Sequence, residues 1–221
     1  MGLCKIVIKE QNKDILVKAQ KQHRFFYDQN EIIMFYAMVA EGDSVLWMGS
    51  REKGLIRFDM RTNEYKVISL KEILHKAVDD VLSLHFSADQ HKLYVGTTSG
   101  LVILSFKNNK TTYQYIGREQ GLLNDMIHGI LEDNKGFLWL STNRGLIKYN
   151  PKNGFSHAYY YSGGVQVGEF SDDAYYKCPY TNSLFLGGID GLLHINKNVI
   201  NDTEFYLEIL LRKIIIGRKS V

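Results

Sequence analysis

The chain has 221 residues, of which 45% are hydrophobic, 12% aromatic and 23% charged, and it contains 2 prolines. This composition excludes a disordered chain and predicts a globular protein. The formal net charge is +3 and no long basic run is present, which argues against nucleic acid as a partner. No apolar run reaches the ~18 residues of a membrane span, so we expect no membrane insertion by this chain.

The N-terminal residues lack the basic region and the following apolar stretch that are typical of a signal peptide. Cys4 and Cys178 lie far apart in the sequence, and two free thiols are favoured over a disulfide. No spacing of cysteine and histidine suits zinc. We therefore expect neither a metal site nor a cofactor.

A short motif around Trp139 occurs four times. Each copy has an aromatic residue in one expected strand and a glycine followed by leucine at the start of the next. The aromatic residues are Trp47, Tyr94, Trp139 and Phe185, and the glycines are Gly54, Gly100, Gly145 and Gly191. Both markers keep a period of 45 to 47 residues, which is typical of propeller blades or repeat arrays.

In chain order, the first residues match the second half of this motif. Gly2–Val7 and Asp14–Ala19 are expected to be the last two strands of a blade, so that residues 1–30 form a half blade and a linker. Four repeats follow at 31–70, 71–117, 118–161 and 162–203. Their inner strands are expected at Met34–Ala40, Val81–Phe86, Met126–Leu131 and Ala174–Cys178.

The expected strands are short and are separated by polar turns. Leu70–Leu74 is the one stretch that suits a helical turn. The sequence therefore predicts an all-β fold, a partial β-propeller of about four four-stranded antiparallel blades plus a half blade at the N-terminus. We expect the repeated aromatic residues to fill the gaps between blades, and the repeated glycines to adopt positive φ angles.

Residues 130–149, which include Leu-Trp-Leu-Ser-Thr-Asn-Arg-Gly-Leu-Ile-Lys-Tyr, closely resemble the two-component-regulator propeller repeat. Gly168–Ser171 and Leu184–Leu192 resemble the last blade of such a propeller. The tail from Phe205, within residues 204–221, resembles the start of the β-sandwich domain that follows the propeller in this family. The resemblance covers nearly the whole chain.

The resemblance implies a role in sensing. Propellers of this family form the periplasmic sensor region of bacterial hybrid two-component systems, in which a signal such as an oligosaccharide controls a histidine kinase and thereby transcription. The family pattern includes more blades, a membrane span and a kinase, so the chain is expected to be a periplasmic fragment of a larger sensor. Self-association through open blade surfaces, or closure into a compressed ring, is expected for an incomplete propeller.

Two adjacent carboxylate pairs, Glu132–Asp133 and Asp172–Asp173, are candidates for acid–base chemistry. Neighbours on a strand point to opposite faces, so the favoured interpretation is that both pairs are solvated turn residues. The seven histidines form no catalytic triad order and no His-x-x-x-His motif. The first three expected inner strands are mostly apolar, with His85 and His128 as the titratable groups, which disfavours catalysis.

The ligand-binding candidates lie in the loops of one propeller face. Tyr159–Tyr161 precedes the last blade, and aromatic rings beside polar groups suit sugar stacking; packed tyrosines at a strand end are the favoured alternative. Charged turn residues on the same face are further candidates, although most such charges are merely solvated. The candidates are Tyr161, Arg144, Asp190, Glu169, Arg51 and Glu119.

Three functions therefore compete. The first is a non-enzymatic sensor segment that binds a periplasmic glycan or similar small molecule. The second is a structural or dimerisation propeller with no ligand of its own. The third, which the apolar inner strands disfavour, is a propeller glycosidase or lyase.

Overall fold

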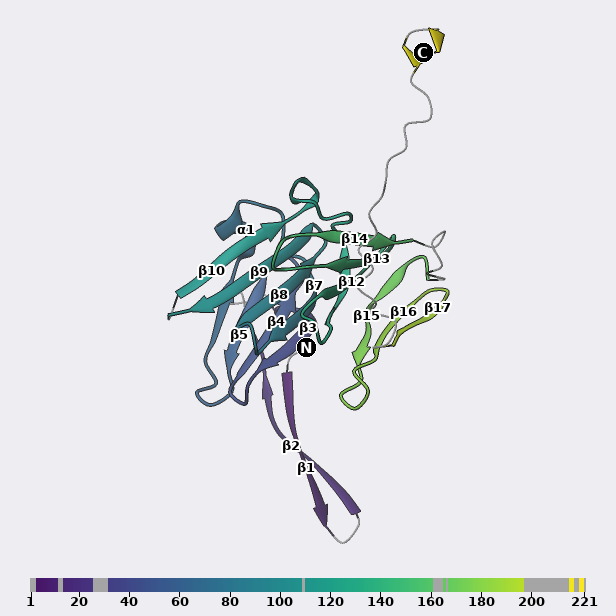
Figure 1. The fold of residues 1–221 in the computed structure, drawn as a ribbon. Helices are drawn as coiled ribbons and strands as arrows, with labels where there is room; N and C mark the ends of the chain where they lie inside the picture. Colours follow the sequence, from purple (N-terminus) through teal and green to yellow (C-terminus); the bar gives the residue numbers. More distant parts are fainter. Residues whose placement is uncertain are drawn as a thin grey trace.

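The computed structural model describes residues 3–11, 14–25, 32–108, 110–160, 165, 167–196, 215–216 and 219–220. Four antiparallel sheets stand side by side around a common axis (Figure 1). The predicted partial β-propeller is therefore confirmed. The helical content of the described residues is one turn of α-helix, α1 (Leu70–Leu74), and a short 3-10 helix, η1 (Arg118–Gln120).

Each sheet is a blade whose strands follow one another from the axis outward. The first blade comprises β3 (Phe35–Glu41), β4 (Val45–Ser50), β5 (Leu55–Asp59) and β6 (Tyr65–Ile68). The second comprises β7 (Val81–Ser87), β8 (Lys92–Thr97), β9 (Gly100–Lys107) and β10 (Lys110–Ile116). The third comprises β11 (Ile127–Glu132), β12 (Leu138–Thr142), β13 (Gly145–Tyr149) and β14 (Ser156–Tyr159). The fourth comprises β15 (Phe170–Lys177), β16 (Leu184–Gly188) and β17 (Gly191–Ile195).

The fourth blade differs from the sequence prediction at its inner strand. β15 begins at Phe170, four residues before the expected start at Ala174, and its pairing with β16 is irregular between Phe170 and Tyr175. The described part of this sheet has three strands. Most of the tail lies outside the described residues, which include only β18 (Ile215–Ile216) and β19 (Lys219–Ser220) there.

The expected half blade is a two-stranded antiparallel hairpin of β1 (Leu3–Gln11) and β2 (Asp14–His23). In Figure 1 it extends away from the four blades. Leu3 and Phe25 pack against the first blade, where they cover Met48 and Phe58. The outer face of the first blade is therefore covered by N-terminal residues.

The repeated aromatic residues fill the gaps between blades, as predicted. Trp47 packs against the second blade, Tyr94 against the third and Trp139 against the fourth, and all three are buried. Burial of each of these large rings contributes on the order of 2–3 kcal/mol to the free energy of folding. Phe185, the fourth copy, is only half-buried and stacks on His194 with ring centroids 4.6 Å apart.

The glycine of the motif has the predicted conformation. Gly145 has φ 105°, and a Cβ at this position would meet the carbonyl oxygen of Tyr159. The short helix α1 is capped by Ser69, whose Oγ accepts a hydrogen bond from the Glu72 N–H. Within the described residues, no helix is long and apolar enough to cross a membrane.

Candidate functional site

A carboxylate binds the indole N–H in two of the four blades. Trp139 Nε1 donates to Asp133 Oδ2 at 2.9 Å, and Trp47 Nε1 donates to Glu41 Oε2 at 2.7 Å. Asp133 is buried and also accepts backbone N–H groups of Lys135 and Phe137. The interpretation of Asp133 as a solvated turn residue is therefore wrong, because its carboxylate organises the turn and orients the tryptophan.

Glu132 is likewise not solvated, because it joins three blades near the axis. His85 Nε2 lies 2.9 Å from Glu132 Oε2, and Gln90 Nε2 donates to Glu132 Oε1 at 2.6 Å. Lys177 Nζ donates to the Glu132 carbonyl at 2.8 Å. Burial by itself raises the pKa of Glu132, but hydrogen bonds from His85, Ser87 and Gln90 together hold this pKa below its ordinary value.

A second polar pair links the third and fourth blades. His128 Nδ1 lies 2.6 Å from Asp172 Oδ1, and His128 is buried. Its other ring nitrogen, Nε2, is buried without a hydrogen-bond partner among the described residues. Asp173, the next residue, has φ 57°, and burial together with the negative charge of Asp172 raises its pKa. The second carboxylate pair therefore lies in the irregular first half of strand β15 rather than in a turn, and both of its residues are exposed to solvent, as expected.

These contacts correct the expectation that the inner strands carry only His85 and His128 as titratable groups. The inner strands also carry Glu41, Glu132, Asp172, Asp173 and Lys177. Glu41, Glu132, Asp172 and Asp173 lie outside the expected strands, which ended at Ala40 and Leu131 and began again at Ala174, whereas Lys177 lies inside the expected fourth inner strand. The available signal was the separation of the two pairs, because Glu132 follows His85 by 47 residues and Asp172 follows His128 by 44, which are both close to the repeat period.

Tyr175 occupies the centre of the propeller. Its hydroxyl hydrogen-bonds to the backbone of Leu84 on β7, and burial raises its pKa. Its ring lies against Gly129 on β11, where a Cβ would be 2.6 Å from Tyr175 Cδ1. One side chain of the fourth blade therefore contacts the second and third blades.

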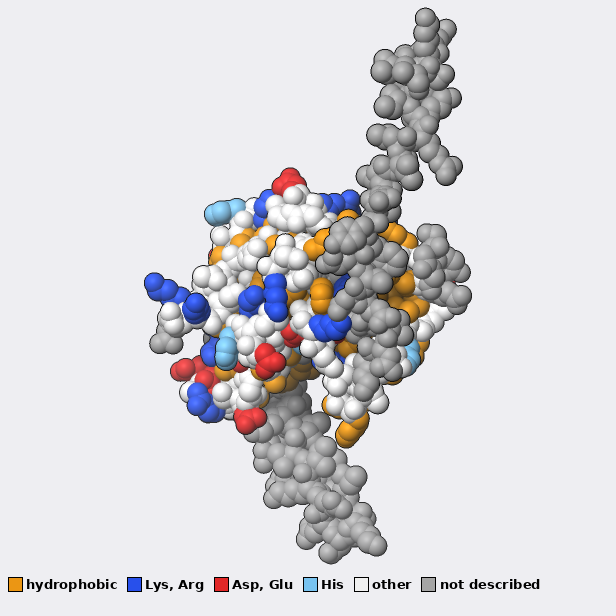
Figure 2. Space-filling view, viewed as in Figure 1, with side chains coloured by type: hydrophobic (Ala, Val, Ile, Leu, Met, Phe, Trp, Pro, Cys, Tyr) orange, Lys and Arg blue, Asp and Glu red, His pale blue; other side chains and the backbone are white. Residues whose placement is uncertain are grey.

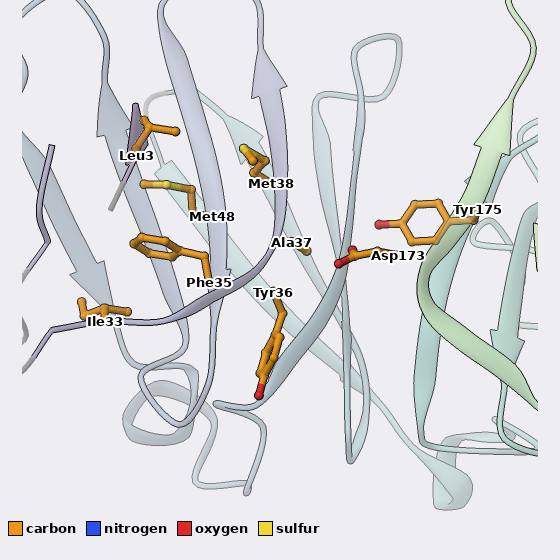
Figure 3. Close-up of a pocket in the computed structure, with 9 residues that line it drawn as sticks. All are labelled: Leu3, Ile33, Phe35, Tyr36, Ala37, Met38, Met48, Asp173 and Tyr175. Carbon is orange, nitrogen blue, oxygen red and sulfur yellow. The ribbon is translucent and has the colours of Figure 1, made fainter. Parts of the chain in front are cut away.

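A cleft of about 410 Å³ opens between β3 of the first blade and β15 of the fourth. The side chains of Asp173 and Tyr175 extend from β15 toward β3 and form the wall of the cleft opposite β3 (Figure 3). Tyr36 brings a second hydroxyl, and the remaining walls are apolar. The apolar lining residues are Leu3, Ile33, Phe35, Ala37, Met38 and Met48. Apolar walls with a few convergent polar groups are typical of small-molecule sites.

The structure places the predicted site residues elsewhere. Arg51, Arg144 and Asp190 lie in the turns between the second and third strands of their blades, and all three are exposed. Glu169 joins the Asp190 turn, because its carbonyl accepts the Ile189 N–H at 3.1 Å. Glu119 is exposed in η1. None of these residues lines the cleft.

The two described tyrosines of the run at 159–161 differ in their surroundings. Tyr159 packs on Trp139 with ring centroids 5.8 Å apart, as the packed-tyrosine alternative predicts, whereas Tyr160 is exposed. Tyr161 lies outside the described residues. Cys178 is a free thiol, and the described residues contain no group of three or more metal-ligating side chains.

Comparisons with known proteins agree with this architecture. The two component regulator propeller family matches residues 121–144. Histidine kinase P4 of Formosa agariphila is 23% identical over 235 residues, which cover 84% of this chain and 17% of the kinase. The chain thus spans a small part of this relative.

Solved structures share the fold. The extracellular domain of the putative hybrid two component system BT3049 from B. thetaiotaomicron has a TM-score of 0.67 and 20% identity, over 89% of this chain and 28% of that chain. The corresponding domain of BT4673 has a TM-score of 0.61 and 18% identity, over 90% and 27% of the two chains. A gluconolactonase from Xanthomonas campestris has a TM-score of 0.60 and 13% identity, over 87% and 68%. Residues 121–144 therefore match the two component regulator propeller model, and the expected resemblance of the chain to extracellular propeller domains of hybrid two-component systems is confirmed.

Proposed function

We propose that this chain is a non-enzymatic, ligand-binding segment of the sensor region of a two-component receptor. The cleft between β3 and β15 is the observation that supports this proposal most directly. Its apolar walls suit the carbon-bearing face of a pyranose, and Tyr36, Asp173 and Tyr175 offer partners for hydroxyl groups. The ligand is a glycan or a similar small molecule.

The position of the cleft suits sensing. It lies between the first and last blades of the chain, so an occupant contacts β3 and β15 at once. If the distance between these blades varies, a ligand that binds one arrangement more tightly increases the population of molecules in that arrangement. In this proposal the segment lies in the periplasm, and the shift reaches a kinase elsewhere in the protein and alters transcription.

The titratable groups near the axis support binding rather than catalysis. The Glu132 carboxylate bonds to His85 and Gln90, and the Glu132 backbone carbonyl accepts a hydrogen bond from Lys177, so this residue serves to join blades. His128 and Asp172 likewise bond to one another across a blade boundary. A glycosidase needs two carboxyl groups that flank a bound sugar, whereas among the described residues that line the cleft Asp173 is the one carboxylate.

A second function, dimerisation, is favoured by the open side of the fourth blade. Leu192 is 66% exposed, whereas its counterparts Leu55, Leu101 and Leu146 are buried by the following blade. Tyr176 on the same sheet is also exposed. Hydrophobic side chains are visible in this part of the molecule in Figure 2. Light scattering after size exclusion tests this idea: Leu192→Glu should convert a dimer into a monomer, and a compact, dilution-stable monomer of the unmodified chain contradicts it.

Calorimetry with a panel of neutral di- to tetrasaccharides tests the sensor proposal. We expect at least one saccharide to bind saturably with 1:1 stoichiometry and to remain intact when recovered. Absence of binding across the panel contradicts glycan sensing. Turnover of any saccharide contradicts the non-enzymatic assignment.

A further inference from the structure

A second hollow, of about 510 Å³, lies between the outer parts of the first and second blades. We name it the basic groove. Its floor includes the half-buried rings of Phe106 and Tyr113 and the edge of Trp47. Four cations surround this floor. They are Arg57 on β5, Lys66 on β6, Lys107 on β9 and Lys110 on β10.

The cations form two like-charged pairs on neighbouring strands. Arg57 is directly opposite Lys66 in the register of β5 and β6, and Lys107 is directly opposite Lys110 in that of β9 and β10. Two like charges directly opposite each other on neighbouring strands destabilise the sheet. None of the four forms an ion pair with a described residue. The chain therefore holds two repulsive pairs on opposite sides of one groove.

The groove contains one carboxylate, which does not neutralise the cations. Glu41 Oε2 accepts the hydrogen bond of Trp47 Nε1 at 2.7 Å. Arg57 lies over the ring of Trp47, with its guanidinium carbon 5.9 Å from the ring centroid. The four cations and one carboxylate leave a local charge of about +3, which attracts anions.

The propeller repeat does not require these cations. In the second blade the positions of Arg57 and Lys66 are taken by Ile103 and Gln114, which pair in the same register. In the third blade Lys148 pairs with His157, and Lys148 lies over the ring of Phe137 at 4.3 Å. A cation over the tryptophan is thus shared with the third blade, where Lys148 Nζ lies 5.5 Å from the Trp139 ring centroid, but the pairing of Arg57 with a second cation, Lys66, occurs in neither of these two blades.

We propose that the basic groove binds a small polyanion with two or more carboxylate, sulfate or phosphate groups. One anionic group bridges Arg57 and Lys66, and another bridges Lys107 and Lys110. Binding replaces two repulsive contacts with charge-assisted hydrogen bonds. The half-buried rings of Phe106 and Tyr113 contact the carbon skeleton between the anionic groups. This site is separate from the cleft at β15 and does not depend on the proposed sensing function.

Titration calorimetry of the full chain at low salt tests the groove, with citrate, sucrose octasulfate and inositol hexakisphosphate as carboxylate, sulfate and phosphate probes. The test variants are Arg57→Gln/Lys66→Gln and Lys107→Gln/Lys110→Gln. The control is Lys71→Gln/Lys152→Gln, which removes two exposed lysines that do not line the groove. All three double variants change the net charge equally, so nonspecific attraction falls equally in each.

We expect at least one probe to bind with 1:1 stoichiometry and to weaken with added salt. Each groove variant should raise the dissociation constant tenfold or more, and the control by less than twofold. The groove variants should also melt at a higher temperature than the unmodified chain when no probe is present, because a repulsive pair is removed. Absence of binding for all three probes overturns the proposal. Equal weakening by groove and control variants also overturns it.

Discussion

The ring of Tyr175 lies directly on Gly129, so that the inner strand of the fourth blade packs against that of the third. A Cβ on Gly129 would be 2.6 Å from Tyr175 Cδ1 and 2.7 Å from Ser141 Oγ. The corresponding inner-strand positions carry Ala37 and Ser83. Glycine is therefore needed at this position because a ring from the neighbouring blade takes the space of a side chain.

Replacing Gly129 by alanine should destabilise the propeller. The added methyl group forces the Tyr175 ring or Ser141 to move, and overpacking of this kind costs about 1–3 kcal/mol. Urea unfolding followed by tryptophan fluorescence measures the change. Gly168→Ala is the control, since its Cβ would meet only Asp190 Oδ2 at 3.8 Å, and it should change stability by less than about 0.5 kcal/mol. Equal effects of the two variants would show that Tyr175 does not occupy the space above Gly129.

Asp133→Ala should destabilise the third blade. The change removes the acceptor for Trp139 Nε1 and for two backbone N–H groups. Each buried donor left without a partner costs about 1–3 kcal/mol. Asp89→Ala, in the exposed turn after β7, is the matched control and should be nearly neutral. A neutral Asp133→Ala variant in the same unfolding assay contradicts the assigned role of this carboxylate.

Leu146→Ala and Leu192→Ala make the same substitution at equivalent positions of two blades. Leu146 is 2% exposed, and its truncation should cost about 2–5 kcal/mol. Leu192 is 66% exposed, and its truncation should cost less than about 0.5 kcal/mol in the monomer. Unfolding at two protein concentrations measures both values. A large, concentration-independent loss for Leu192→Ala would mean that its side chain is covered within the same molecule.

Asp173→Asn should stabilise the chain at neutral pH. The pKa of Asp173 in the folded protein is raised above its ordinary value of 3.8 by burial and by the charge of Asp172, so its ionised form opposes folding. This penalty is fully present above the folded pKa and disappears as the pH falls below about 3.8. Asparagine tolerates the positive φ at this position. Melting temperatures of both proteins from pH 7 to pH 3 check the prediction. Asp172→Ala, which removes the hydrogen-bond partner of His128, should lower stability at pH 7. A melting temperature for Asp173→Asn at or below that of the unmodified chain at pH 7 contradicts the assigned pKa.

The blade architecture was predictable because one period places Trp139 and Gly145 in the same register as three other copies. The strand pair β1–β2 was predictable from the same register, and helix α1 from the stretch Leu70–Leu74 between two repeats. The titratable groups at the axis were not, since they depend on contacts between strands 44 to 47 residues apart, such as His128–Asp172 and His85–Glu132. The longer β15 was hidden because its first half pairs irregularly and contains Asp172 and Asp173, which are uncommon in strands.

The cleft was not predictable for a related reason. It forms where β3 meets β15, and these strands belong to different copies of the repeat. The predicted ligand residues were chosen from turns, where side chains such as Arg144 are exposed and do not converge. Aligning the four repeats identifies the residues that every blade shares. The cleft instead depends on the distance and orientation between the first and fourth blades.

Calorimetry with the neutral saccharide panel on two tryptophan variants tests the central proposal most directly. Met38 lines the cleft and is 64% exposed, so Met38→Trp fills the cleft without replacing a core side chain. Met34→Trp places the same ring on an exposed residue that does not line the cleft and serves as the control. We predict that the saccharide bound by the unmodified chain binds Met34→Trp with unchanged affinity and binds Met38→Trp at least tenfold more weakly. Unchanged affinity in Met38→Trp would contradict the assignment of ligand binding to the cleft between β3 and β15.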